Sequence, residues 1–174
     1  RVRAMEDEIR SENFMGNWEE EDFSFLFFSE PAHDLVEKLL SAQPELRLLD
    51  QFHMTYEEWQ GGRLCPFEAG SFLICPPWEE PLESEIRDQK LKILLDPGVV
   101  FGTGTHPTTY DCLEMLELAC SREKIESVLD LGTGTGLLSL AAARLGCTRI
   151  LALDFNLLAE KTAKRNVLLN QLDH

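Results

Sequence analysis

The chain has 174 residues, and 44% of them are hydrophobic, which is enough for one core of ordinary size and a small additional region. Its formal net charge of −15 repels phosphate groups over much of the surface, so the composition argues against nucleic acid as a direct partner and suits a basic protein. No apolar run reaches the length of a membrane-spanning helix, and the first residues lack the apolar run of a signal peptide, so we expect no membrane partner.

The N-terminal part of the chain predicts only a portion of a small α/β region. Residues 1–16 are polar and charged, with weak helical periodicity. Residues 23–28 predict a strand, and Pro31 at the first helical position begins a helix whose apolar residues share one face over residues 33–41. The acidic run at residues 19–22 is interpreted as a solvated turn, not a binding site. One strand and one helix cannot close a core.

A loop rich in turn-forming residues occupies the middle of the chain, at residues 95–109. Pro97-Gly98 is a turn pair. Gly102 and Gly104 lack a Cβ, so they leave the backbone free to wrap around a ligand.

A helix is predicted directly after this loop, over residues 110–120. Thr108 or Thr109 can cap it, and Asp111 resembles the acidic member of a capping box. A helix N-terminus in this place offers backbone N–H groups and a positive dipole end, which would suit a carboxylate. Thr109 is a candidate for contact with such a ligand; the competing interpretation is that it only caps the helix. His106, a single loop histidine before a proline, is interpreted as structural.

Three alternating glycines, Gly132, Gly134 and Gly136, follow a strand predicted at residues 128–131 and precede an apolar helix. Glycines allow the chain to reverse tightly with positive φ and let a ligand approach the backbone. A dinucleotide fingerprint has glycine or alanine where this chain has Leu137. The spacing therefore suits a pyrophosphate poorly and is similar to the G-x-G-x-G turn of class I methyltransferases, whose cofactor has no phosphate.

A second strand, predicted at residues 148–153, ends in Asp154, a little over twenty residues after Asp130. A carboxylate in this place can accept hydrogen bonds from both hydroxyl groups of a ribose. Phe155 follows and could lie against an adenine ring. The competing interpretations are that Asp154 caps the next helix and that Phe155 packs in the core.

The segment 95–109 reads LDPGVVFGTGTHPTT and closely resembles the signature of the ribosomal protein L11 methyltransferases. The glycine turn, Asp154 and a helix predicted at residues 157–170 follow it in register. Residues 72–78 also resemble the strand that leads into the catalytic domain of that family. The resemblance covers about residue 51 to the end of the chain.

This resemblance implies an enzyme that transfers a methyl group from S-adenosyl-L-methionine to an amine nitrogen, either a lysine side chain or an N-terminal amine, with ribosomal protein L11 as the candidate substrate. Such a transfer needs a neutral amine nitrogen that is aligned with the methyl group. The amine can lose its proton to water on entering a partly desolvated pocket, so no catalytic base is predicted. The resemblance matches Thr109, Gly132 and Asp154 to cofactor contacts of the family. The predicted cofactor-binding residues are Phe101, Thr109, Asp130, Gly132, Gly134, Gly136, Asp154 and Phe155.

Two other functions compete with this one. A catalytically inactive relative or fragment could bind S-adenosylmethionine, or a partner, as a scaffold. A dinucleotide-dependent oxidoreductase is disfavoured by Leu137.

The predicted fold class is α/β, comprising the first half of a class I, Rossmann-like methyltransferase sheet and a partial N-terminal α/β region. By resemblance, residues 1–50 belong to a ferredoxin-like substrate-recognition region, residues 51–62 form a helical linker, and residues 63–174 begin the methyltransferase domain. The family's asparagine-containing motif after its fourth strand has no counterpart here. We therefore expect a truncated chain that does not complete catalysis alone.

Five cysteines without C-x-x-C spacing predict neither a disulfide framework nor a zinc site, and four scattered histidines give no ligand spacing for a metal. This cysteine usage predicts a reducing, cytoplasmic setting.

Overall fold

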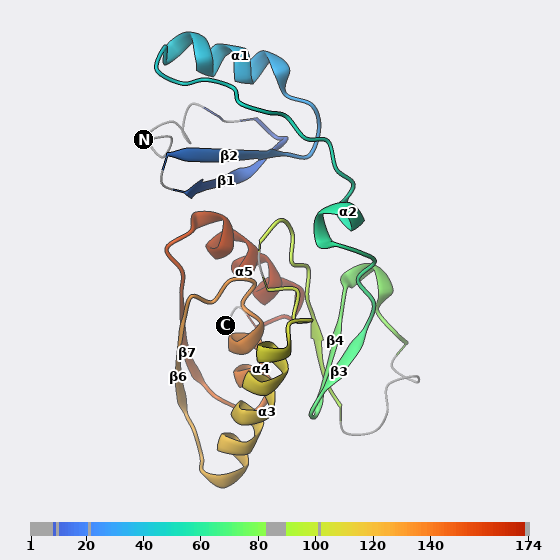
Figure 1. Cartoon of the computed structure of the whole chain (residues 1–174). Helices are drawn as coiled ribbons and strands as arrows, with labels where there is room; N and C mark the ends of the chain where they lie inside the picture. The colour runs from blue at the N-terminus through green and yellow to red at the C-terminus, as the bar shows by residue number, and fades with distance from the viewer. Residues whose placement is uncertain (1–8, 10, 21, 83–89, 101, 173–174) are drawn as a thin grey trace. The chain divides into compact units, whose positions relative to one another are not determined.

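The computed structural model describes residues 9, 11–20, 22–82, 90–100 and 102–172 (Figure 1). The chain divides into two compact units, Arg1–Tyr56 and Glu57–His174. The boundary lies inside segment 51–62, where the short helix α2 (Tyr56–Gln60) is found. Each unit contains a hydrophobic cluster of its own.

The first unit consists of a hairpin and a helix. The strands β1 (Phe14–Glu20) and β2 (Phe23–Phe28) pair antiparallel, and α1 (His33–Ala42) follows them. Ile9 and Leu39 are buried. The residues packed against this pair are Phe14, Leu26, Phe28 and Leu35.

The predicted strand and helix of this unit are confirmed, but the sequence does not predict β1. Its register shifts between Phe14 and Gly16, so the alternation that indicates a regular strand is interrupted. The acidic run does not form a turn throughout, because Glu19 and Glu20 are the last residues of β1. Pro31 is also not the first helical residue, because it precedes the N-cap of α1, Ala32.

The second unit contains two small sheets. β3 (Phe67–Ala69), β4 (Phe72–Cys75) and β5 (Leu91–Leu94) form the first, in which β4 pairs antiparallel with β3 and parallel with β5. β6 (Ser127–Leu131) and β7 (Arg149–Leu153) form a parallel pair. The mixed α/β fold and both strands predicted beside the glycine turn are confirmed.

Three helices of eight or more residues accompany these sheets in the described part of the unit: α3 (Pro107–Arg122), α4 (Leu137–Arg144) and α5 (Leu157–Leu169). A short 3₁₀ helix, η2 (Pro77–Glu79), follows β4. Helix α4 contacts β5, β6, β7 and α3, so its apolar sequence is explained by contacts on several sides (Figure 1). The buried core comprises Ala69, Phe72, Ile74, Ile93, Leu95, Leu113, Leu137, Leu140 and Ala141.

One face of the parallel β6–β7 pair is apolar and exposed. Leu129 lies opposite Leu151, and Leu131 lies opposite Leu153. These four side chains, which we call the leucine face, are between 46% and 71% exposed. Parallel strands are ordinarily covered on both faces, which explains why the sequence places leucine here.

Among the described residues, no helix combines the length and apolar character needed to cross a bilayer. The same residues contain no group of three or more His, Cys, Asp or Glu side chains arranged to hold a metal ion.

Candidate cofactor site

The glycine turn begins where β6 ends. Gly132, Gly134 and Gly136 have positive φ values of 74°, 56° and 85°, as the sequence predicts. The N–H groups of Gly132 and Thr133 both donate to the carbonyl oxygen of Leu153, at 2.8 and 3.0 Å, so the turn packs against the end of β7. A Cβ built on Gly132 would meet no atom within 4 Å. A ligand can therefore approach the backbone at this position.

Gly136 has a different environment from Gly132. It is the N-cap of α4, and a Cβ on it would lie 3.2 Å from the Cβ of Ala163 in α5. The missing side chain lets α4 and α5 pack closely. A contact between Gly136 and a cofactor remains a prediction.

Asp130 lies beneath the turn and is buried. Its Oδ2 accepts hydrogen bonds from the hydroxyl groups of Thr133 and Ser139, both at 2.7 Å. The carboxylate therefore ties β6 to the turn and to the first part of α4, where a negative charge also interacts favourably with the helix dipole. This arrangement gives Asp130 a role in shaping the turn, and cofactor contact remains a prediction for it.

Asp154 joins the glycine turn to the end of β7. Its Oδ2 accepts from the backbone N–H of Gly134 at 3.0 Å, and its Oδ1 accepts from that of Asn156 at 2.9 Å. Each carboxylate oxygen has a second lone pair, so a ribose diol can still be accepted. The interpretation of Asp154 as a helix cap is wrong, because Asn156 caps α5 by accepting from the N–H of Leu158 at 2.9 Å.

Phe155 extends into solvent next to Asp154, with 84% of its surface exposed. The interpretation that it packs in the core is therefore wrong. An exposed aromatic ring beside the carboxylate is suitably placed for stacking on an adenine.

The signature segment begins with a turn after β5. The predicted Pro97-Gly98 turn is confirmed by a 3.1 Å bond from the N–H of Val100 to the carbonyl oxygen of Pro97. Asp96 is buried, and its Oδ1 accepts from the N–H of Gly98 at 3.0 Å. Phe101, a predicted cofactor contact, lies outside the described residues.

Gly102 and Gly104 approach the protein itself closely. A Cβ on Gly102 would lie 3.1 Å from the Oγ1 of Thr135, and one on Gly104 would lie 2.6 Å from the Cζ of Phe67. Both have positive φ, at 112° and 86°. The structure thus explains these glycines by internal packing, whereas the sequence suggested space for a ligand.

Helix α3 begins earlier than predicted. Pro107 is its first residue and His106 its N-cap, with the His106 Nδ1 accepting from the N–H of Thr108 at 3.3 Å. The cap predicted at Thr108 or Thr109 and the capping box with Asp111 are therefore wrong. The structural interpretation of His106 is supported. Thr109 lies in the first turn of α3, half-buried, and its N–H donates to the His106 carbonyl oxygen at 2.9 Å.

Hydrogen bonds of Thr135 and Gly134 also connect the segments of the candidate site. The Oγ1 of Thr135 donates to the carbonyl oxygen of Gly102 at 2.9 Å, which joins the glycine turn to the signature segment. The bond from Gly134 to Asp154 joins the same turn to the end of β7. The segments therefore meet at the carboxyl ends of parallel strands, where open α/β folds bind ligands.

Sequence reasoning missed the polar residues that hold these segments, namely Thr135, Ser139, Asn156 and Asn166. One signal was available in α5, where Asn166 lies inside the last turns of the helix. Asparagine is unfavourable in a helix interior unless its side chain has specific partners.

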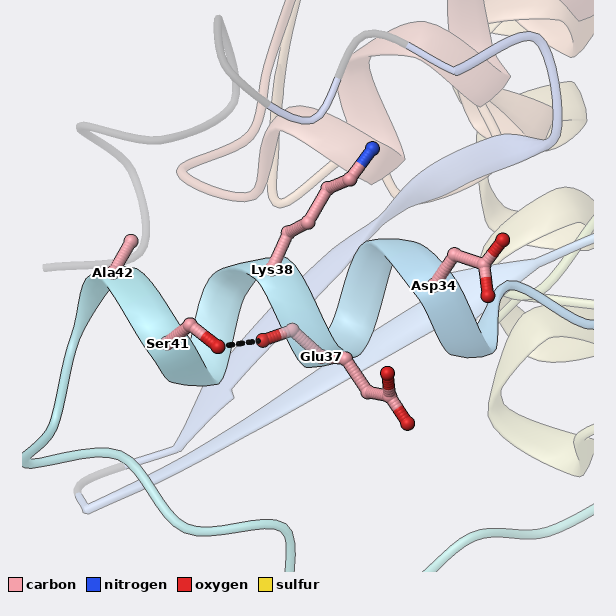
Figure 2. A pocket seen from close by; sticks show the side chains of 5 residues that line it. All are labelled: Asp34, Glu37, Lys38, Ser41 and Ala42. Atoms are coloured by element: carbon pink, nitrogen blue, oxygen red, sulfur yellow. Dashed lines mark hydrogen bonds between the residues drawn. The ribbon is translucent and has the colours of Figure 1, made fainter.

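The first unit has a shallow groove on α1. Its lining residues Asp34, Glu37, Lys38, Ser41 and Ala42 all come from that one helix, and their side chains extend in different directions (Figure 2). The Ser41 hydroxyl donates to the Glu37 carbonyl oxygen at 2.8 Å. These side chains do not converge on a common point, so the groove has no arrangement for catalysis.

The amino-acid sequence from residue 18 to residue 174 matches the family model described as ribosomal protein L11 methyltransferase (PrmA). The chain belongs to the ribosomal protein L11 methyltransferase family. The resemblance predicted from the signature segment is thereby confirmed, and neither the catalytically inactive scaffold relative nor the oxidoreductase is favoured.

Individual relatives agree with this assignment. The ribosomal protein L11 methyltransferase of Halalkalibacterium halodurans is 46% identical over 104 residues, which are 60% of this chain and 32% of that protein. The one from Staphylococcus saprophyticus is 38% identical over 152 residues, 81% of this chain and 47% of that protein. The chain thus spans less than half the length of these curated relatives.

A solved structure is also similar. The crystal structure of the ribosomal protein L11 methylase from Lactobacillus delbrueckii subsp. bulgaricus has 32% sequence identity and a TM-score of 0.55. The match covers 62% of this chain and 53% of that chain. It supports the class I methyltransferase fold for the matched part.

Proposed function

We propose that this chain carries the S-adenosylmethionine half-site of a protein methyltransferase that modifies amine nitrogens. The observation that carries this proposal is the hydrogen bond from the backbone of Gly134 to the carboxylate of Asp154, beside the open approach at Gly132. Family membership supports the same function.

The residues present fit this cofactor. Asp154 retains lone pairs for the two ribose hydroxyls, and Phe155 presents an exposed ring for adenine. The backbone at Gly132 can be approached without a Cβ in the way. Thr109, at the start of α3, is the candidate for contact with the amino-acid end. When bound, the cofactor supplies a methyl group activated by a sulfonium sulfur.

We infer that the methyl acceptor is an amine on a basic protein, either a lysine side chain or an N-terminal amine, with ribosomal protein L11 as the leading candidate. The net charge of −15 favours encounter with a basic partner and disfavours nucleic acid. A lysine enters this reaction as the neutral amine, which partial desolvation in a pocket favours by lowering its pKa. The five cysteines are free thiols, which agrees with a reducing, cytoplasmic setting.

We also propose that residues 1–50 contribute to substrate recognition and that residues 51–62 link them to the methyltransferase region at 63–174. The division of the chain at Tyr56 supports a linker in that segment.

Calorimetric titration of the 174-residue chain with S-adenosylmethionine tests the proposal, with NADH as the comparator and circular dichroism as the check of folding. We expect binding of S-adenosylmethionine alone. A folded chain that prefers NADH would contradict the assignment. Binding followed by no transfer of labelled methyl to ribosomal protein L11 would favour a scaffold relative.

A further inference from the structure

Asn166 in α5 is a fully buried polar side chain placed between two loops of the candidate site. Its Oδ1 accepts from the N–H of Asp96 at 2.9 Å, and its Nδ2 donates to the carbonyl oxygen of Asp96 at 3.0 Å. The same Nδ2 donates to the carbonyl oxygen of Thr135 at 2.9 Å. One amide therefore holds the start of the signature segment and the middle of the glycine turn together.

These bonds matter because strand pairing reaches only the first residues of each loop, through the N–H of Leu95 to Cys75 and the N–H groups of Gly132 and Thr133 to Leu153. Beyond them, the described residues 96–100 and 102–106 form no strand, and residues 132–136 reverse the chain between β6 and α4. Buried backbone groups must find partners, and here the Asn166 side chain supplies them. A buried amide that uses both of its N–H donors and its oxygen fixes its partners in one arrangement.

Thr135 extends this connection to a second point of the signature segment. While its carbonyl oxygen accepts from Asn166, its Oγ1 donates to the carbonyl oxygen of Gly102 at 2.9 Å. Asp96, Asn166, Thr135 and Gly102 thus form a continuous hydrogen-bonded path across the two loops. Arg165 also contacts Asp96 at 2.8 Å, but it is largely exposed, so screening by water weakens its contribution.

We propose that Asn166 is a positioning residue for the cofactor, because it sets the spacing between the signature segment and the glycine turn. This inference rests on the proposed function, since a cofactor held by Thr109 on one side and by Gly132 and Asp154 on the other requires that spacing. Asn166 need not touch the cofactor. Its effect on binding passes through Asp96 and Thr135.

The neighbouring Asn170 provides a matched control. It accepts from the N–H of Leu94 at 2.9 Å and donates to the carbonyl oxygen of Leu94 at 2.7 Å, so it bonds to the last residue of β5 as Asn166 bonds to Asp96, two residues further on. Among the described residues, its other side-chain and carbonyl hydrogen bonds are with Asn166 and Arg144, and none is with the glycine turn. Asn166→Ala and Asn170→Ala therefore both remove buried hydrogen bonds to β5 and its continuation, but only the first separates the two loops.

The test compares S-adenosylmethionine affinity by calorimetry and melting temperature by circular dichroism for the wild-type chain and both variants. We expect both substitutions to lower the melting temperature, whereas only Asn166→Ala weakens cofactor affinity, by about tenfold. Equal affinities for the two variants would assign Asn166 a merely structural role and overturn the inference.

Hydrogen–deuterium exchange supplies a readout that does not depend on ligand. Asn166→Ala should raise exchange at residues 96–105 and at residues 132–136 together, while Asn170→Ala should leave the second range unchanged. If Asn166→Ala does not fold, Thr135→Val takes its place in the affinity measurement, because it preserves the shape of the side chain and removes only the hydrogen bond to Gly102. We expect it to weaken S-adenosylmethionine affinity about threefold. An affinity equal to that of the wild-type chain would then refute the role of this hydrogen-bonded path in cofactor binding.

The two proposals can fail separately. A wild-type chain that binds no S-adenosylmethionine, but whose variants show the expected difference in exchange, would overturn the proposed function and leave Asn166 as the connection between the loops. A wild-type chain that binds, with no difference in affinity between the two variants, would overturn the positioning role alone.

Discussion

Alanine substitution at Gly136 and at Gly132 separates two reasons for having glycine in the same turn. Both residues have left-handed φ values, 85° and 74°, so an added Cβ costs about 1–2 kcal/mol in backbone strain at either position. Only at Gly136 would the Cβ also meet a neighbour, the Cβ of Ala163 at 3.2 Å, which adds about 1–3 kcal/mol of overpacking. We expect Gly136→Ala to lower the free energy of unfolding by about 2–5 kcal/mol, against about 1–2 kcal/mol for Gly132→Ala.

Urea denaturation followed by circular dichroism measures this difference. With a slope of about 2 kcal/mol per molar urea, the midpoint should fall by about 1–2.5 M for Gly136→Ala and by about 0.5–1 M for Gly132→Ala. Gly136→Ala should cost less in an Ala163→Gly background than in the wild-type chain, because the methyl group that the new Cβ meets is then absent; Ala163→Gly alone is the reference, since glycine inside a helix costs about 1 kcal/mol of its own. Equal midpoints for Gly136→Ala and Gly132→Ala, or an equal cost of Gly136→Ala in both backgrounds, would refute the reasoning.

Other predictions concern the site, the thiols and the surface. Asp154→Ala should weaken S-adenosylmethionine binding by about 1–3 kcal/mol in a calorimetric titration, and unchanged affinity would exclude ribose binding by its carboxylate. Burial raises the pKa of the Cys75 and Cys147 thiols, so iodoacetamide at pH 8 should modify the exposed cysteines first, as peptide mass spectrometry can show. The stability that these protonated thiols contribute is present below their ordinary pKa and is lost as the pH rises through the raised values; a midpoint of unfolding that stays constant well above pH 9 would contradict this. Replacing Leu131 and Leu153 by lysine should reduce binding of the dye ANS to the leucine face, and unchanged fluorescence would mean that the dye binds elsewhere.

The sequence predicts the glycine turn and Asp154 well because the pattern that encodes them is local. A strand followed directly by alternating glycines constrains the backbone within a few residues, and the next strand ends in the acidic residue that the turn contacts. The start of α3 was also encoded locally, since a proline without an N–H suits the first helical position and makes His106 the cap. The prediction placed the start of α3 too late because it gave the capping preference of threonine more weight than the preference of proline for the first helical position.

The connection through Asn166 could not be read from the sequence in the same way. Asp96 lies 70 residues before it and Thr135 lies 31 residues before it, so the contact depends on how the helix packs across both loops. Gly104 shows the same limitation, because the ring of Phe67 that excludes its Cβ comes from a distant strand. At such positions the sequence gives the residue type, but it does not show which distant residue lies against it.

Asn166 of α5 and Asn170, the C-cap residue of that helix, also have a consequence for the sheet itself. Along a strand, alternate residues direct their backbone groups to the same side, and β5 uses Leu95 to continue its pairing with β4. Leu94 and Asp96 face the other side, where Asn170 and Asn166 satisfy both their N–H and their carbonyl groups. A helix thereby protects the outer edge of β5 against pairing with a strand from another molecule, and loss of these side chains would open an edge at which aggregation can begin.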